Sequence, residues 1–277
     1  MTPEQVGNRV DLCRIHLANR WLCPEKTTMP LLSSFLKKAT GPVFDTPVAP
    51  DAPFFAIGDI HGDYASMEQI LIKIDAVSQG EPVIAVGDFV DRGPRSADVL
   101  AWLYHLSKTY PDEFICLMGN HEAMLLAFLD DPAETGRRWL NHGGLQTLES
   151  YKIARRSDDT HEALRDQLAE AMGEDLIAWL RGLPAHWQSG NVVVTHAGAN
   201  PALPIDAQPA SNLIWGHPDF DTALREDGLW IVYGHRIVEE PSADRGRIAI
   251  DTGAYATQCL TAARVEPGNV AFMNSVQ

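Results

Sequence analysis

The stretch Gly58-Asp59-Ile60-His61-Gly62 follows the short apolar run 54–57, as expected for a turn at the end of a β-strand. Glycine lacks a Cβ, so on both sides of this turn the backbone can come close to a bound group. A carboxylate oxygen and an imidazole nitrogen are donors that suit Mn²⁺, Fe or Zn²⁺. A turn cap beside a surface histidine explains the stretch equally well, so the metal hypothesis needs support from the rest of the chain.

Downstream, apolar runs of strand length alternate with segments of helical spacing. The strand-like runs are residues 54–57, 82–86, 114–118, 192–194, 229–232, 247–250 and, as the final strand, 259–265. A helix is predicted over residues 66–74 with Ser66 as its N-cap, and another follows Pro94, which suits a first helical turn. This alternation is typical of an α/β domain.

Two parts of the chain depart from the alternation. Residues 1–52 are predicted to be a partly helical lead-in, with helical spacing over 6–21 and a short basic amphipathic piece over 29–38. That piece fits a helix docked on the domain or a weak contact with a membrane surface. Residues 130–190 are mostly polar with helical spacing, and we expect them to cover the strand ends as a lid. The domain itself is predicted to occupy residues 53–277.

The composition narrows the function classes. The chain has 277 residues, 45% of them hydrophobic, and a formal net charge of -15, which argues against non-specific binding of nucleic acid. No stretch approaches the roughly 20 apolar residues of a membrane span, so no stable membrane association is expected. There is no signal-peptide h-region. Four cysteines without a CxxC pair favour a reducing compartment, and a cytoplasmic location is predicted.

The main evidence for function is a recurrence. Five times an apolar run ends and the next residues combine glycine with a side chain of metal-ligand type: Asp59 and His61, Asp88, Asn120, His196, and His235. Binding sites in α/β sheets collect at the carboxyl ends of strands, so these side chains can converge. Six donors are too many for one octahedral ion that each binds once. They suit two ions with one shared aspartate.

The motifs GDIHG, GDFVDRG, GNHE, THAG and YGH resemble the signature motifs of the metallophosphoesterase superfamily. The GDFVDRG and GNHE versions are similar to those of its phosphoprotein phosphatase branch, particularly the bacterial and phage serine/threonine phosphatases. The resemblance extends over about residues 54–265. It implies a calcineurin-like α/β sandwich, with central β-sheets flanked by helices and a helical lid.

The resemblance also implies a dinuclear metal centre. Asp59 and His61 would hold the first ion, and Asp88 would bridge to the second. Asn120, His196 and His235 would complete the second site. In such a centre a hydroxide bridging the two ions is the nucleophile, and the ions clamp the phosphoryl oxygens. The bacterial relatives favour Mn²⁺, although Fe and Zn²⁺ suit the same donors.

The remaining roles implied by the resemblance are in catalysis and substrate binding. His121 would be the general acid that protonates the leaving oxygen, and Asp91 would hold its imidazole. Arg92 and Asn120 would contact the phosphate, and the planar fork of Arg92 suits two oxygens. The family's second phosphate-binding arginine has no clear counterpart. We expect Arg225 to fill this place, with His217 or no residue at all as alternatives.

Three functions fit these motifs. The first choice is a metal-dependent phosphomonoesterase acting on phosphorylated proteins at serine or threonine. The alternative is a symmetrical dinucleoside polyphosphate hydrolase, for which Arg137, Arg138, Trp139, Arg155 and Arg156 are available in the lid segment. A non-catalytic scaffold is the third, but such a protein should have lost ligands or the acid. Small phosphoesters are further candidate substrates.

Overall fold

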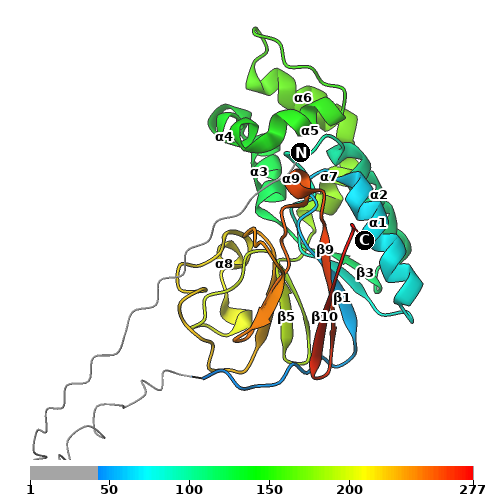
Figure 1. Ribbon diagram of the computed structural model, residues 1–277. Coiled ribbons are helices and arrows are strands. Elements are labelled where there is room, and N and C mark those ends of the chain that lie inside the picture. The colour runs from blue at the N-terminus through cyan, green and yellow to red at the C-terminus, as the bar shows by residue number, and fades with distance from the viewer. Residues whose placement is uncertain (1–42, 277) are drawn as a thin grey trace, which may run out of the picture. The chain divides into compact units, whose positions relative to one another are not determined.

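The computed structural model describes residues 43–276. Within these residues, two five-stranded sheets form the centre of the domain (Figure 1). The helix expected over 6–21 and the basic piece expected over 29–38 lie outside the described residues. Among the described helices, none is both long and apolar enough to cross a membrane.

The first sheet carries the first three site loops. Its strands, in spatial order, are β10 (Asn269–Asn274), β9 (Thr261–Glu266), β1 (Phe54–Ile57), β2 (Val83–Ala85) and β3 (Phe114–Cys116). Strands β1, β2 and β3 run parallel, so their carboxyl ends share one edge, whereas β9 and β10 pair antiparallel. A strand over 259–265 was expected to be the last, but a hairpin through Gly268 adds β10.

The second sheet carries the other two site loops. Its strands, in spatial order, are β4 (His186–Ser189), β5 (Val192–Thr195), β6 (Trp230–Tyr233), β8 (Arg247–Ala249) and β7 (Ser242–Asp244). The middle three run parallel, and the two edge strands pair antiparallel. The end of the segment expected to be a helical lid is therefore strand β4, which is held by its pairing with β5.

Alternation along the strands explains the layers. Phe54 and Ala56 face a core shared with Val194 and Val232 of the second sheet, so the two sheets pack face to face. Phe55 and Ile57, on the opposite face, instead pack beneath the helices that cover the first sheet. These helices are α1 (Tyr64–Val77), α2 (Ser96–Thr109) and α3 (Asn120–Asp130). The two sheets with outer helices confirm the predicted α/β sandwich.

The helical insertion, as we call residues 132–181, consists of consecutive helices beyond α3, in the upper half of Figure 1. They are α4 (Pro132–Trp139), the π-helix η1 (Leu140–Gly144), α5 (Leu145–Ser150), α6 (His161–Met172) and α7 (Glu174–Arg181). Three short helices complete the described part of the chain: η2 (Ile205–Ala207), α8 (Ala210–Trp215) and α9 (Ala254–Thr257). The insertion packs on α2 and α3, which places its α4–α5 turn beside the site loops.

One predicted helix start is wrong. Helix α1 begins at Tyr64, and its N-cap is Asp63, whose side chain accepts a hydrogen bond from the backbone N–H of Ser66. Ser66 instead donates its hydroxyl hydrogen to the carbonyl oxygen of Gln258. The Asp63 carboxylate lies directly after the turn and directly before the first helical residue. It is therefore in the position from which an N-cap side chain accepts from the free N–H groups of the first turn.

Candidate active site

The loops at the carboxyl ends of five strands bring the predicted ligands together. These loops follow β1, β2, β3, β5 and β6. Five of the eight described non-glycine residues with positive φ lie in them: His61, Asp88, Asp91, Arg92 and His235. Positive φ is costly for residues with a Cβ and is retained where the surroundings impose it. Such strain is therefore concentrated in the candidate site.

Asp88 lies at the centre of the cluster. Its Oδ2 is 3.4 Å from Nε2 of His61, and its Oδ1 is 3.3 Å from Nε2 of His196. Two sets of donor atoms, each within 4.8 Å of one another, share this carboxylate. One set contains His61 and His121, and the other contains His196 and His235. Asp88 thus lies where one carboxylate can reach both sets of donors.

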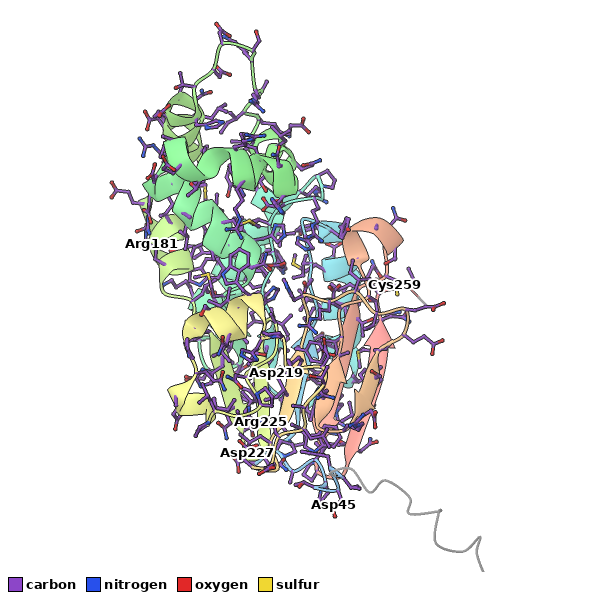
Figure 2. All side chains as sticks on the ribbon, turned by 90° about the vertical axis from the view of Figure 1, so that its left-hand side faces the viewer. Asp45, Arg181, Asp219, Arg225, Asp227 and Cys259 are labelled. Atoms are coloured by element: carbon purple, nitrogen blue, oxygen red, sulfur yellow. The ribbon has the colours of Figure 1, made fainter. Side chains whose placement is uncertain are left out.

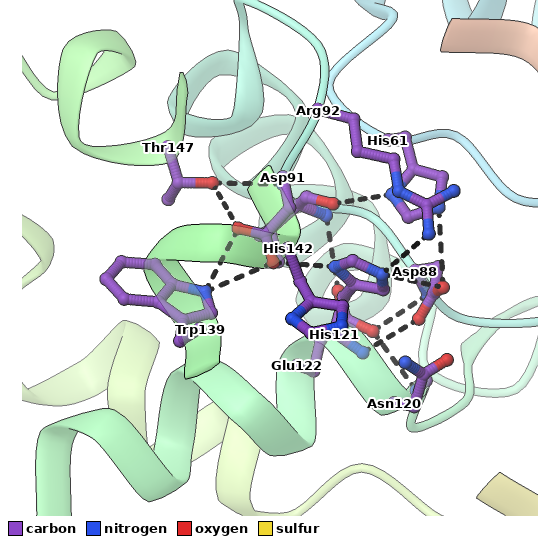
Figure 3. Close-up of polar contacts among 12 residues, drawn as sticks. His61, Asp88, Asp91, Arg92, Asn120, His121, Glu122, Trp139, His142 and Thr147 are labelled. Carbon is purple, nitrogen blue, oxygen red and sulfur yellow. Dashed lines mark hydrogen bonds and ion pairs between the residues drawn. The ribbon is translucent and has the colours of Figure 1, made fainter. Parts of the chain in front are cut away.

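His61 is oriented by a single hydrogen bond. Its Nδ1 donates to the carbonyl oxygen of Val90 at 2.8 Å (Figure 3). A carbonyl can only accept, so the proton is on Nδ1 and the lone pair of Nε2 faces Asp88. Fixing a ligand imidazole through its second nitrogen in this way is common at metal sites.

Asn120 gathers the second set of donors. Its side-chain Oδ1 is 2.9 Å from Nε2 of His196 and 2.8 Å from Nδ1 of His235. Two ligand atoms bound to one ion at about 2.1 Å and at right angles lie about 3 Å apart. The spacing of the three side chains therefore fits ligands of a common divalent ion.

The environment of Asp59 also suits a cation. Its Oδ2 accepts a hydrogen bond from the backbone N–H of His235 at 2.9 Å. Its Oδ1 is buried and has no hydrogen-bond partner among the described residues. Burial, followed by the charges of Asp251 and Asp88, raises the pKa of Asp59 well above its ordinary value. A buried carboxylate with a free oxygen and acidic neighbours needs a positive charge nearby.

The histidines of the cluster are in the form that binds metals. Burial lowers the pKa of His61 to about 3 and that of His196 to about 4. Burial also lowers the pKa of His235. All three are therefore neutral near pH 7, as a ligand imidazole must be. Together with the free oxygen of Asp59, these donors fit two divalent cations.

His121 differs from the other histidines. Its Nδ1 lies 2.7 Å from Oδ2 of Asp91, and its Nε2 lies 3.2 Å from Nη2 of Arg92 (Figure 3). Burial lowers the pKa of His121, but the Asp91 hydrogen bond and the charges of Asp88 and Asp91 outweigh it, so the pKa lies above the ordinary value. Asp91 thus holds Nδ1, and Nε2 is the nitrogen left facing the cluster, beside Arg92.

Two residues support these loops from behind. Glu122 is buried, and its two carboxylate oxygens accept hydrogen bonds from the backbone N–H groups of Asp88, Phe89, Val90 and Gly119 at 2.8–3.2 Å. Asp251 is also buried, and its Oδ1 accepts from the backbone N–H of Gly253. Both carboxylates therefore fix loop backbone, as expected of structural residues.

Arg225 does not join the cluster, and we correct its assignment. Its guanidinium is buried and donates to the backbone carbonyl oxygens of Asn200 and Leu203 and to the carboxylate of Asp227. Figure 2 shows it with Asp227 in the lower part of the domain. Because these donors are already used by the protein, Arg225 has a structural role and not the expected phosphate-binding one. The alternative, His217, contacts Asp219.

The motifs gave no indication of three residues near His121. Trp139 and Thr147 both contact the carboxylate of Asp91. The ring of Tyr255 lies 4.9 Å from the guanidinium of Arg92 and 5.5 Å from the ring of His61. Trp139 stands four residues before the glycine pair Gly143-Gly144 and looks like a core residue in the sequence, so only its distance from Asp91 in space reveals the contact.

Comparisons with known proteins agree with this geometry. The family model described as calcineurin-like phosphoesterase matches residues 52–239. A symmetrical bis(5'-nucleosyl)-tetraphosphatase of Nitrosococcus oceani is 34% identical over 149 residues, which are 53% of this chain and 44% of that protein. The asymmetrical bis(5'-nucleosyl)-tetraphosphatase PrpE of Oceanobacillus iheyensis is 29% identical over 231 residues, or 75% of this chain and 86% of that protein. The chain thus matches less than half the length of the first relative.

A solved structure shows the same fold. It is a protein serine/threonine phosphatase from Saccharomyces cerevisiae with similarity to human phosphatase PP5, and it superposes with a TM-score of 0.54 at 20% identity. The superposition covers 81% of this chain and 80% of that one. With the family model matching more than half of its residues, this chain belongs to the calcineurin-like phosphoesterase family.

Proposed function

We propose that the protein is a metal-dependent hydrolase of dinucleoside polyphosphates, with diadenosine tetraphosphate as its representative substrate. The observation that carries the hydrolase part is the shared Asp88 carboxylate, which lies between two sets of donors and beside His121. The substrate class is supported by the two curated relatives named above, both of which are bis(5'-nucleosyl)-tetraphosphatases. We assign the activity to the domain at residues 53–277.

The proposed centre takes two divalent ions, for which Mn²⁺ is the first choice. Asp59 and His61 would hold one ion, Asn120, His196 and His235 the other, and Asp88 both. When bound, such ions supply Lewis-acid stabilisation of the phosphoryl oxygens and lower the pKa of water.

The protein's own groups account for substrate orientation and departure of the leaving group. Arg92 is partly exposed and next to His121, so its guanidinium can bind two oxygens of a phosphoryl group. His121 would donate the Nε2 proton to the leaving oxygen. In that step the oxygen of an attacking water forms a new P–O bond and releases one proton to solvent, while the P–O bond to the leaving group breaks. The leaving oxygen keeps that electron pair and uses it to bind the His121 proton, and the N–H electron pair returns to Nε2. Asp91 holds the imidazole through Nδ1.

Two exposed aromatic–arginine pairs favour a nucleotide substrate. Tyr255 is 38% exposed beneath Arg92, and Trp215 is 38% exposed beneath Arg138 at 4.7 Å. The first pair lies beside His61. The second joins α4 to the end of α8, next to the loop that carries His196. Planar rings backed by arginine are suited to stacking a nucleobase.

The sequence offered four arginines and one tryptophan of the lid segment for binding a dinucleotide. The structure leaves the arginines accessible to a ligand, but not the tryptophan. Trp139 is fully buried and cannot stack a base. Arg137 and Arg138 are exposed, and so are Arg155 and Arg156 in the connection between α5 and α6. Arg138 is therefore the insertion residue that we place at a nucleoside.

The experiment compares substrates on one enzyme. Metal-loaded enzyme should hydrolyse diadenosine tetraphosphate with a higher kcat/KM than a phosphoserine or phosphothreonine peptide. Chromatography of the products would also distinguish two ADP from ATP plus AMP. Tyr255→Ala should raise KM for the dinucleotide and leave a simple aryl phosphate unaffected. Tyr110→Ala is the matched control, since Tyr110 is an exposed tyrosine at the end of α2.

Protein serine/threonine phosphatase activity, the first choice from the sequence, is now the second candidate. The GDFVDRG and GNHE motifs favour it, because they resemble those of the phosphoprotein phosphatase branch. A clear preference for the phosphopeptide in the same comparison would reverse the order of the two proposals.

A further inference from the structure

The carboxylate of Asp91 is completely buried and receives hydrogen bonds from three side chains. Nδ1 of His121 lies 2.7 Å from Oδ2, and the hydroxyl of Thr147 donates to Oδ1 at 2.7 Å. Nε1 of Trp139 lies 3.1 Å from both oxygens. The Thr147 hydroxyl also accepts from the backbone N–H of Asp91 at 2.9 Å. Hydrogen bonds thus hold both the carboxylate and the backbone N–H of Asp91.

Two of these three donors come from the helical insertion. Trp139 ends α4, and Thr147 lies in α5, on the other side of the π-helix η1 (Figure 3). The indole is closely packed: its ring stacks on Phe128 at 4.5 Å, and a Cβ on Gly144 would come within 2.5 Å of it. The indole N–H therefore has little freedom to point anywhere but at Asp91.

The insertion also holds the residue after Asp91. The backbone N–H of Arg92 donates to the carbonyl oxygen of Gly143 at 3.3 Å. Gly143 has φ +108, and a Cβ there would lie 2.6 Å from the Arg92 nitrogen. The α4–α5 turn is thus closely fitted to the Asp91–Arg92 backbone.

We propose that Trp139 and Thr147 are positioning residues for proton transfer, acting through Asp91 on His121. Two donors on Asp91 fix the direction of its Oδ2, and Oδ2 in turn fixes the imidazole with its proton on Nδ1 and with Nε2 toward the cluster. This inference rests on the acid role proposed for His121. It does not depend on which phosphoester is the natural substrate.

The test removes one donor at a time. Thr147→Val deletes the hydroxyl at similar volume, Thr147→Ser restores it, and Trp139→Phe deletes the indole N–H. With an alkyl phosphate, kcat should fall about 10–100-fold in the two deletion variants and recover in Thr147→Ser. With an activated aryl phosphate, kcat should change little. KM and metal content should stay at their wild-type values.

Matched controls lie elsewhere in the fold. Thr135→Val removes the hydroxyl of a half-buried threonine in α4, which donates to the carbonyl oxygen of Asp131. Trp102→Phe changes a tryptophan in α2 that is 43% exposed. Neither control should alter kcat with either substrate. If Trp139→Phe failed to fold, the Thr147 series alone would still test the proposal.

A second readout needs no catalysis. In metal-free protein labelled with ¹⁵N-histidine, the Nδ1–H proton bonded to Asp91 should give a downfield signal that His121→Asn removes. Thr147→Val should shift or broaden it, and Thr147→Ser should restore it. An unchanged signal in Thr147→Val, equal losses of kcat on both phosphates, or lost metal would each overturn the proposal. A wild-type enzyme inactive on dinucleotides would refute the proposed substrate but leave this readout intact.

Discussion

His121 lies between two carboxylates and bonds closely to only one of them. Its Nδ1 is 2.7 Å from Oδ2 of Asp91, whereas its Nε2 is 3.9 Å from Oδ2 of Asp88. A histidine that binds a metal through one ring nitrogen also often donates the N–H of its other ring nitrogen to a carboxylate. The arrangement therefore suits either a proton donor or a seventh ligand, and metal content distinguishes them.

His121→Asn should keep both metals and lose turnover. With a poor leaving group we expect kcat to fall about 10²–10⁴-fold, because no group then protonates the departing oxygen. The loss should be much smaller with an activated aryl phosphate. Elemental analysis of the purified variant is the check, and loss of one equivalent of metal would make His121 a ligand.

Asp88→Asn should abolish metal binding and activity together. Asp88 is the only residue common to both donor sets found among residues 43–276. Removing its charge weakens both proposed sites at once. Titration calorimetry with Mn²⁺ on metal-free protein measures this directly. Asp98→Asn is a suitable control, since Asp98 forms an exposed pair with Arg95. Wild-type affinity in Asp88→Asn would contradict a bridging role.

Arg225→Ala should reduce stability and leave substrate binding unchanged. The variant leaves Asp227 without its partner and frees two carbonyl oxygens, Asn200 and Leu203. Asp227 is 39% exposed, so most of the cost comes from the two unpaired carbonyl oxygens, and the loss of stability should be about 1–3 kcal/mol. Urea unfolding gives the stability, and steady-state kinetics gives KM. A raised KM at unchanged stability would restore the phosphate-binding assignment.

The Glu81–Arg264 pair should make stability depend on acid pH. The Arg264 guanidinium, 2.8 Å from Glu81, is the main cause that lowers the pKa of this carboxyl to about 2. A lowered folded-state pKa stabilises the protein above the ordinary value of about 4.5, and this stabilisation is lost as the pH falls towards 2.

Glu81→Gln should therefore flatten the fall of unfolding free energy between about pH 5 and pH 3. The effect should be about 1 kcal/mol or less, because the pair is partly exposed. Urea unfolding at several pH values measures it. An identical pH dependence in wild type and variant would show that the pair contributes nothing.

The sequence was sufficient for the fold class and for the set of candidate ligands that the structure brings together. Strand, glycine turn and ligand follow one another locally, and parallel strands place their carboxyl ends at one edge, so Asp59, Asp88 and Asn120 had to converge. His196 and His235 follow the same rule on the second sheet. These features depend on local pattern, which is why one chain reveals them.

Features that depend on packing could not be predicted from local sequence patterns. Strand β4 looked like part of a helical segment because pairing with β5, and not its own pattern, makes it a strand. The N-cap of α1 was placed at Ser66 because two capping side chains stand close together, and only backbone geometry selects Asp63.

By itself, the sequence determined the donors, their order and the α/β sandwich, because each of these follows from short-range spacing. Only the tertiary structure decided that Arg225 donates hydrogen bonds to Asp227 and to two carbonyl oxygens. The same is true of the hydrogen bonds that Trp139 and Thr147 donate to Asp91. These contacts join residues 48 and 56 positions apart in Trp139–Asp91 and Thr147–Asp91. Their partners are chosen by how helices and sheets pack, and no local pattern specifies that.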